Sequence, residues 1–246
     1  MPKVNNAGYS ETTKRKYRQF EYLINVHVVI TKKIIEKHLW TSREYFFVDM
    51  NAGPGILDNK KGSPVLFMDA AKKARIDFEA YFIDICQENI KSLREIFDGE
   101  KCEILQVDNE KFLLDQAKQP MEKRKYGLIY ADPNGIANFD LLGEFFQHSK
   151  FSCIDVAINC NATAIKRLKK FKLEDCISKI NKKHWMLCEP ASAHQWTILV
   201  GTNWINFPTF EKIGFYRINT KEGQEFFRKA NFTKAELAER YLKGKN

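Results

Sequence analysis

Residues 46–55 join an apolar segment directly to a glycine-rich turn, and this junction constrains the fold more than any other feature of the chain. Residues 46–49 have the composition of a buried β-strand, and Ala52, Gly53, Pro54 and Gly55 follow almost at once. Glycine at the carboxyl end of a parallel strand lets the backbone approach a ligand closely, because it has no β-carbon to clash. The junction therefore indicates a nucleotide-like cofactor loop, although the same residues also suit an ordinary tight turn.

Three further apolar segments end in acidic residues at the spacing of successive strands. These strand ends are Asp84, then Asp108 with Asn109, then Asp132 with Pro133 and Asn134. A carboxylate about one βαβ unit after the glycines can accept hydrogen bonds from both hydroxyls of a ribose, so Asp84 is the expected sugar ligand. Asp108 and Asn109 are suited to the edge of an adenine. Each acid has an alternative role as the N-cap of the following helix.

The apolar periodicity alternates between helix and strand. Helices are predicted at 12–40, 64–75, 88–97, 110–118 and 139–147, and strands at 45–50, 79–84, 102–107, 127–131 and 153–160. Two more strands, 184–188 and 195–200, are expected to form an antiparallel hairpin at the sheet edge. This alternation predicts one α/β domain with a doubly wound, mostly parallel sheet of seven strands. Residues 1–40 are expected to form an N-terminal helical extension, and 211–246 a basic helical tail.

Residues 45–202 resemble the class I S-adenosylmethionine-dependent methyltransferases. The resemblance lies in the loop Asp49-x-x-Ala52-Gly53-Pro54-Gly55, followed by Gly62-Ser63-Pro64, and in the acidic strand ends. It is nearest to three-Cys-motif partner proteins and adenine-N6 nucleic-acid methyltransferases. It implies a Rossmann-like fold with S-adenosyl-L-methionine as the cofactor. In that family the matching residues bind the cofactor, with Asp49, Ala52, Gly53, Pro54 and Gly55 on the methionine side, Asp84 at the ribose, and Asp108 with Asn109 at the adenine.

Asp132 and Pro133 match the first half of the Asp-Pro-Pro-aromatic turn that binds the amine to be methylated in such enzymes. Asp132 and the Pro133 carbonyl are expected to accept the hydrogens of an exocyclic amine, and Asn134 to contact the edge of the base. The sequence departs from the motif at Asn134 and Gly135. Because Gly135 has no ring to stack on a base, either Phe139, Trp196 or Trp204 supplies that ring or the substrate is not a base.

A surplus of basic residues indicates the partner. The formal net charge is +9, and cations cluster in two runs, which contain Lys14, Arg15, Lys16 and Arg18, and Lys166, Arg167, Lys169 and Lys170. Such runs are typical of a surface that follows the phosphates of DNA or RNA. A solvated helix face is the alternative. Together with the resemblance, the charge favours methylation of adenine N6 in nucleic acid.

Two other functions remain open. Cys160 ends the strand at 153–160, where a thiolate would be able to attack C6 of a pyrimidine, as in RNA cytosine-C5 methyltransferases; a buried inert thiol is the alternative. The chain can also be a catalytically weak cofactor-fold partner of a larger system, with a protein partner, because the motif departs at Asn134 and Gly135.

The cysteines and the apolar residues indicate the setting of the chain. Its six cysteines form no Cys-x-x-Cys pair and lie mostly in apolar segments, so no metal site is expected. No apolar run is long enough to span a membrane, and the first residues show no apolar signal core, so a cytoplasmic location without membrane contact is expected.

Overall fold

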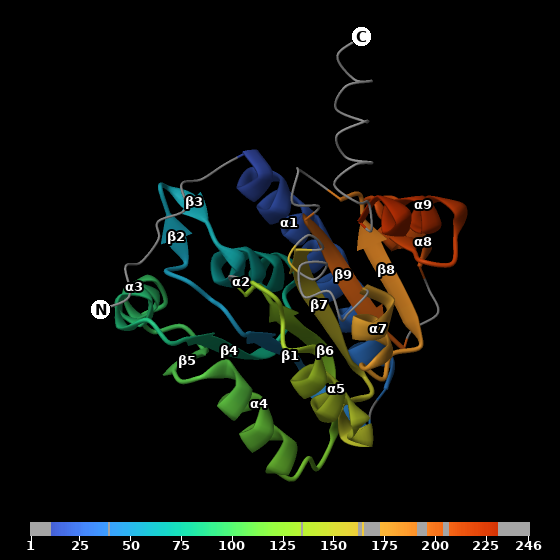
Figure 1. Cartoon of the computed structure of the whole chain (residues 1–246). Helices are drawn as coiled ribbons and strands as arrows, with labels where there is room; N and C mark the ends of the chain where they lie inside the picture. Colours follow the sequence, from blue (N-terminus) through green and yellow to red (C-terminus); the bar gives the residue numbers. More distant parts are fainter. Residues whose placement is uncertain are drawn as a thin grey trace.

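The computed structural model describes residues 11–38, 40–133, 135–161, 164, 173–190, 196–203 and 207–230. Its centre is an eight-stranded sheet with helices on both faces (Figure 1). The strands are β1 Thr41–Asp49, β4 Phe78–Asp84, β5 Glu103–Gln106, β6 Arg124–Ala131, β7 Ile154–Asn161, β8 His184–Cys188, β9 Trp196–Thr202 and β10 Phe215–Arg217. A separate two-stranded hairpin pairs β2 Ile56–Leu57 with β3 Lys60–Lys61.

The strand order is β10-β8-β9-β7-β6-β1-β4-β5. The pairs from β5 to β7 are parallel, and β9 runs antiparallel to both β7 and β8. The predicted doubly wound, mostly parallel sheet is therefore confirmed, and the expected hairpin of β8 and β9 forms, with β9 on the inner side. Strand β10 adds a short eighth strand inside the segment that the sequence analysis assigned to a helical tail.

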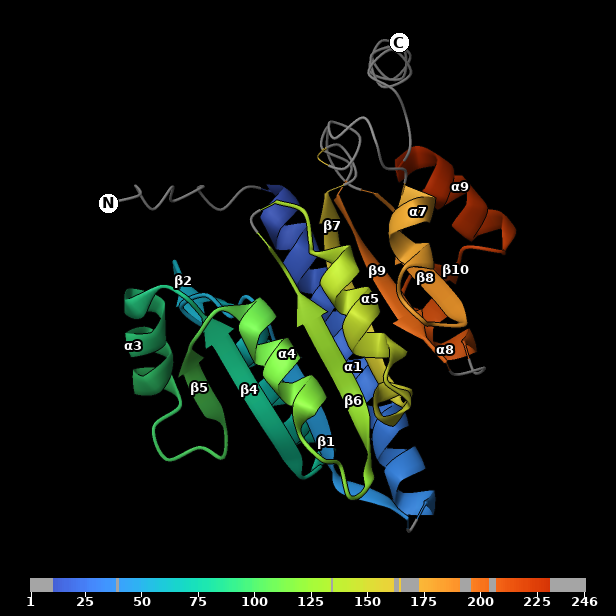
Figure 2. The same cartoon turned by 60° about the horizontal axis from the view of Figure 1, so that its bottom comes forward.

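Helices cover both faces of the sheet, with α4 and α5 in front of it and α1 behind it in Figure 2. The helices are α1 Glu11–Lys37, α2 Ser63–Ala74, α3 Gln87–Ile96, α4 Asn109–Lys118, α5 Phe139–Gln147, α7 Leu173–Ser178, α8 Pro208–Glu211 and α9 Lys221–Ala230, with a 3-10 turn η1 at Ser149–Phe151. Two apolar cores result. One joins α1, α2 and α3 to the sheet, and the other joins α4, α5 and α7 to its opposite face.

Helix α1 is part of the domain core and not an appendage. Its residues Phe20, Leu23, Ile24 and Val28 are fully buried against the sheet. A buried polar contact adds to this packing, since the Tyr45 hydroxyl of β1 lies 2.7 Å from His27 Nδ1 and His27 Nε2 lies 3.1 Å from Asp155 Oδ2 of β7. Burial raises the pKa of Tyr45 well above its usual value, so the hydroxyl stays protonated. The position of α1 over β1 and β7 is thereby fixed.

The order of the strands places a topological switch between β1 and β6. From β1 the chain continues outward to β4 and β5, and it then returns to β6 on the other side of β1. In open α/β sheets, ligands bind beyond the carboxyl ends of the strands at such a switch. The glycine loop follows β1 and Asp132 follows β6, so the predicted site residues lie on the two sides of this point.

Candidate active site

The glycine loop crosses from β1 toward β4. Gly53 and Gly55 have φ values of +62° and +77°, a left-handed conformation that side chains disfavour. The Ala52 amide donates to the Ile83 carbonyl at 2.9 Å, and the Gly53 amide donates to Asp84 Oδ2 at 2.9 Å. A β-carbon at Gly53 would meet no atom of the described residues within 4 Å, so the loop leaves open space there.

Asp84 organises the loop at the end of β4. Besides the Gly53 amide it accepts from the Cys86 amide at 2.8 Å and from Asn89 Nδ2 at 3.1 Å. It is not the N-cap of α3, because Cys86 holds that position. A carboxylate has about four acceptor positions, so these three bonds leave capacity for a hydroxyl. Its assignment to a ribose stays a prediction.

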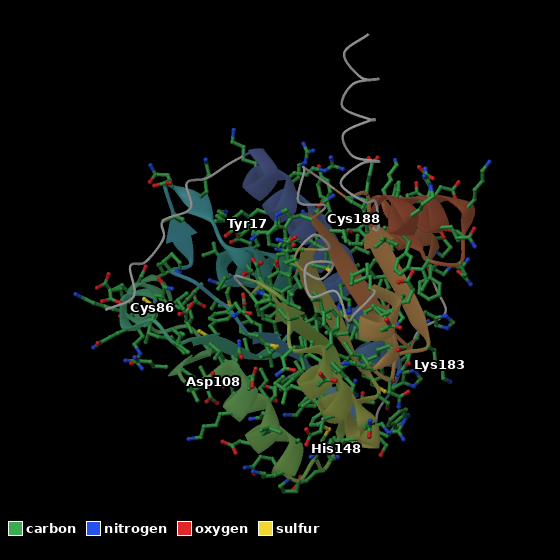
Figure 3. The ribbon with its side chains drawn as sticks, in the orientation of Figure 1. Tyr17, Cys86, Asp108, His148, Lys183 and Cys188 are labelled. Carbon is green, nitrogen blue, oxygen red and sulfur yellow. The ribbon has the colours of Figure 1, made fainter. Side chains whose placement is uncertain are left out.

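Asp108 is the N-cap of α4, which is the alternative role that the sequence predicted for it. It is exposed at the start of α4 (Figure 3), and its Oδ1 accepts from the amides of Glu110 and Lys111, each at 3.0 Å. The neighbouring Asn109 donates from Nδ2 to the Met50 carbonyl at 3.0 Å, which fixes the backbone after β1. Capping does not exclude ligand binding, because Oδ2 receives no hydrogen bond within the described residues.

Asp49 is fully buried at the end of β1. Burial raises the pKa of its carboxyl to about 7, although the Ser63 hydroxyl and the Asn51 amide lower it, and the charges of Asp132 and Asp84 add to the rise. The Asn51 amide donates to Oδ1 at 3.2 Å; the Ser63 hydroxyl is close enough to lower the pKa, but Oδ2 has no hydrogen-bond partner of good geometry among the described residues. A buried acceptor without a donor is unusual in a folded protein and is suited to a ligand that brings one.

Asp132 is held from three sides. Lys16 Nζ of α1 lies 2.7 Å from Oδ2, and Asn159 Nδ2 of β7 donates to Oδ1 at 2.6 Å. The Asp132 amide donates to Asn51 Oδ1 at 3.2 Å, so the loop after β1 contacts the turn after β6. Asn134 lies outside the described residues. Asn159 was not predicted from the sequence, because its only signal is an amide inside a mainly apolar strand, and Lys16 was expected to bind phosphate.

The first basic run is partly engaged within the protein. Arg15 contacts Glu189 at 3.5 Å, and Lys229 of α9 lies 2.7 Å from the same carboxylate. The two elements that the contact of Arg15 with Glu189 joins can be found in Figure 3 by their labelled residues, Tyr17 on α1 and Cys188 at the end of β8. Arg18 is exposed. The second run, with Lys166, Arg167, Lys169 and Lys170, lies outside the described residues, and the phosphate-binding prediction for both runs stays a prediction.

Two candidates from the sequence are corrected by burial. Phe139, the first residue of α5, is buried in the core and cannot stack on a base. Cys160 is also buried, and burial raises the pKa of its thiol far above the usual value, so it is not the thiolate that attack on a pyrimidine requires. Trp196 is half-buried at the start of β9, where it pairs with Asn161, while His194 and Trp204 lie outside the described residues.

One surface concavity lies near the strand ends. It runs along α3, is lined by Gln87, Lys91, Arg94 and Gln106, and borders the Asp84 side of the strand ends and not Asp132. Within the described ranges, no group of three or more histidine, cysteine or acidic side chains is placed to hold a metal ion. No described helix combines the length and apolarity needed to cross a bilayer.

No protein-family model matches the chain, and no curated protein sequence matches it. Among solved structures, protein LPL1258 from Legionella pneumophila aligns with a TM-score of 0.55 and 14% identity, over 79% of this chain and 89% of that chain. An rRNA methylase from Streptococcus thermophilus aligns with a TM-score of 0.43 and 10% identity, over 74% of this chain and 96% of that one. SMU.1697c from Streptococcus mutans, solved in complex with SAH, gives a TM-score of 0.40 and 10% identity, over 71% and 97%. At these identities the similarity to LPL1258 shows the fold alone, and the two lower scores support nothing further.

Proposed function

We propose that this chain is an S-adenosylmethionine-dependent methyltransferase. One observation carries the proposal: a glycine loop and three acids lie at the carboxyl ends of four adjacent strands, on both sides of the topological switch. Asp84 and Asp108 follow β4 and β5 on one side, and Asp132 follows β6 on the other. A nucleoside cofactor on the first side would meet an acceptor group held at the second.

The residues of the first side fit that cofactor. Gly53 leaves open space, Asp84 keeps acceptor capacity for hydroxyls, and the buried Oδ2 of Asp49 has no donor among the described residues. Ile85, directly after Asp84, is 72% exposed, which gives the site an aliphatic surface for a flat ring. S-Adenosylmethionine, when bound, supplies a methyl group activated by a sulfonium.

The proposed acceptor is the exocyclic amine of a nucleic-acid base, adenine N6 in DNA or RNA. That nitrogen is a poor nucleophile because its lone pair is delocalised into the ring. Asp132 and the Pro133 carbonyl would accept its hydrogens and orient its lone pair, with the largest effect as the nitrogen becomes tetrahedral. The net charge of +9 and the exposed Arg18 support a polyanionic substrate. Trp196, half-buried at the start of β9 and paired with Asn161 at the carboxyl end of β7, is a candidate ring to contact a base.

Methyl transfer from tritiated S-adenosylmethionine to DNA and to RNA, followed by mass spectrometry of the nucleosides, tests the proposal. The expected product is N6-methyladenine. Asp132→Asn should lower turnover at least about 100-fold and leave cofactor affinity unchanged, because its contact matters in the transition state. Asp84→Ala should instead weaken cofactor binding by about 1–3 kcal/mol in calorimetry.

Asp77→Asn, which changes an exposed acid directly before β4, at the amino end of the strand, is the matched control and should alter neither quantity. Absence of methyl transfer to any nucleic acid would favour the alternative of a partner protein without its own activity. 5-Methylcytosine as the product would contradict the amine mechanism.

A further inference from the structure

The ion pair between Lys16 and Asp132 brings a cation from α1 into the centre of the acceptor site. The two atoms are 2.7 Å apart, and the side chains are 20% and 12% exposed. We propose that Lys16 is a positioning residue of the acceptor site, which holds the Asp132 carboxylate in a fixed orientation toward the incoming amine. This inference rests on the proposed function and extends it to a residue outside the cofactor fold motifs.

The burial of Lys16 distinguishes it from a phosphate contact. A lysine that follows phosphates keeps its ammonium in solvent, whereas that of Lys16 is turned inward onto an acid. Burial lowers the pKa of Lys16, but the charges of Asp132, Tyr17 and Asp49 raise it by more, so the pKa lies above its ordinary value. Lys16 is therefore an ammonium throughout the neutral range.

Two anchors on opposite oxygens fix the carboxylate. Lys16 binds Oδ2 and Asn159 Nδ2 binds Oδ1, so one anchor comes from α1 and the other from β7. The two anchors occupy one lone pair on each oxygen, and the buried Tyr130 hydroxyl also faces Asp132, which leaves at most two acceptor positions for hydrogens of a substrate. Asn159 is 2% exposed, and its own Oδ1 has no partner among the described residues, which provides a further acceptor beside the carboxylate.

The charges around Asp132 explain why it needs a cation. Asp49 of β1 and Tyr130 of β6 are fully buried nearby, and the charge of Asp132 contributes to the raised pKa of each. A carboxylate left in this setting without a counterion carries the desolvation penalty of an unpaired buried charge. Loss of Lys16 would remove both the counterion and one anchor, and the acceptor site would lose its geometry while the cofactor side stays intact.

The test compares steady-state kinetics of Lys16→Met, which keeps the length of the side chain, with Lys16→Arg, which keeps the charge. Lys16→Met should lower kcat at least about tenfold while KM for S-adenosylmethionine and for nucleic acid each change by less than about twofold. Lys16→Arg should recover a large part of kcat. Lys33→Met, which removes an exposed lysine from the same helix, should match the native protein. Lys16→Gln, which keeps a donor without the charge, provides the same comparison should Lys16→Met not fold.

The outcomes separate this inference from the proposed function. A native kcat in a folded Lys16→Met or Lys16→Gln variant, or a raised KM for nucleic acid at native kcat, overturns the positioning role alone and returns Lys16 to phosphate binding. A native chain that transfers no methyl group overturns the proposed function, and the positioning role falls with it.

Discussion

Asp49 makes the free protein less stable near neutral pH than it is in mild acid. Its carboxyl has a pKa of about 7 in the folded chain because it is buried, whereas an unfolded aspartate titrates near pH 4. Between these values the folded state binds the extra proton. The contribution of Asp49 to the free energy of unfolding therefore falls as the pH rises from about 4 to about 7, and the full penalty remains above pH 7.

Asp49→Asn should remove this penalty with little change of shape. Its stability gain over the native protein should be small near pH 4 and grow to a few kcal/mol, at most about 4, at pH 7. Urea denaturation of the cofactor-free proteins at pH 4, 5.5 and 7 measures the difference. Asp98→Asn, at an exposed position, should show no such trend. A gain that does not vary with pH would contradict the assignment.

Single residues also show what the sequence can and cannot predict. The glycine loop and the acids at 49, 84, 108 and 132 were predictable because each ends a local apolar segment, and strand ends of a parallel sheet meet at one edge. The contact of Lys16 with Asp132 was not predictable, because the two residues are 116 positions apart and only the packing of α1 brings them together. The capping role of Asp108 was predicted as an alternative, and the hydrogen bonds to α4 decide it.

At the scale of elements, the central parallel strands β1, β6 and β7 were recognised from continuous apolar runs, as expected for strands that are buried on both faces. Strand β10 was missed because its three residues form a strand only through pairing with β8. The sequence also did not show how closely the backbones of β1 and β6 approach each other. A β-carbon at Gly127 of β6 would lie 1.8 Å from the Phe46 carbonyl oxygen of β1, so the central pair requires glycine there.

Gly127→Ala should therefore disrupt the middle of the sheet. The clash is with backbone, which cannot rotate away, so we expect a loss of more than about 3 kcal/mol or failure to fold. Gly99→Ala is the control: Gly99 has a φ of +72° but no described atom within 4 Å of an added β-carbon. Strain alone should cost it about 1 kcal/mol. Equal denaturation midpoints for the two variants would contradict the tight approach of β1 and β6.

At the scale of the whole molecule, some cations form ion pairs within the protein and others are exposed to solvent. Arg15, Lys16 and Lys229 pair with acids at the carboxyl ends of the strands. Any phosphate binding would then depend on other cations, and the exposed Arg18 and the second basic run are the proposed ones. Net charge alone does not say which cations serve a partner, because association depends on where the charge lies.

We expect the second basic run to bind phosphate, and this is tested by replacing four of its residues with glutamine, at Lys166, Arg167, Lys169 and Lys170. Affinity should fall for all nucleic-acid sequences alike, and the slope of log K against log salt should flatten by up to about 0.9 for each lost phosphate contact on duplex DNA. Fluorescence anisotropy at several salt concentrations measures both. The control makes the same change in net charge at four exposed lysines remote from the acceptor site, Lys33, Lys37, Lys118 and Lys123. If both quadruple variants lost affinity equally, long-range charge and not a defined phosphate-binding surface would account for binding. If the salt slope of the first variant matched that of the native protein, the second run would be only a solvated surface.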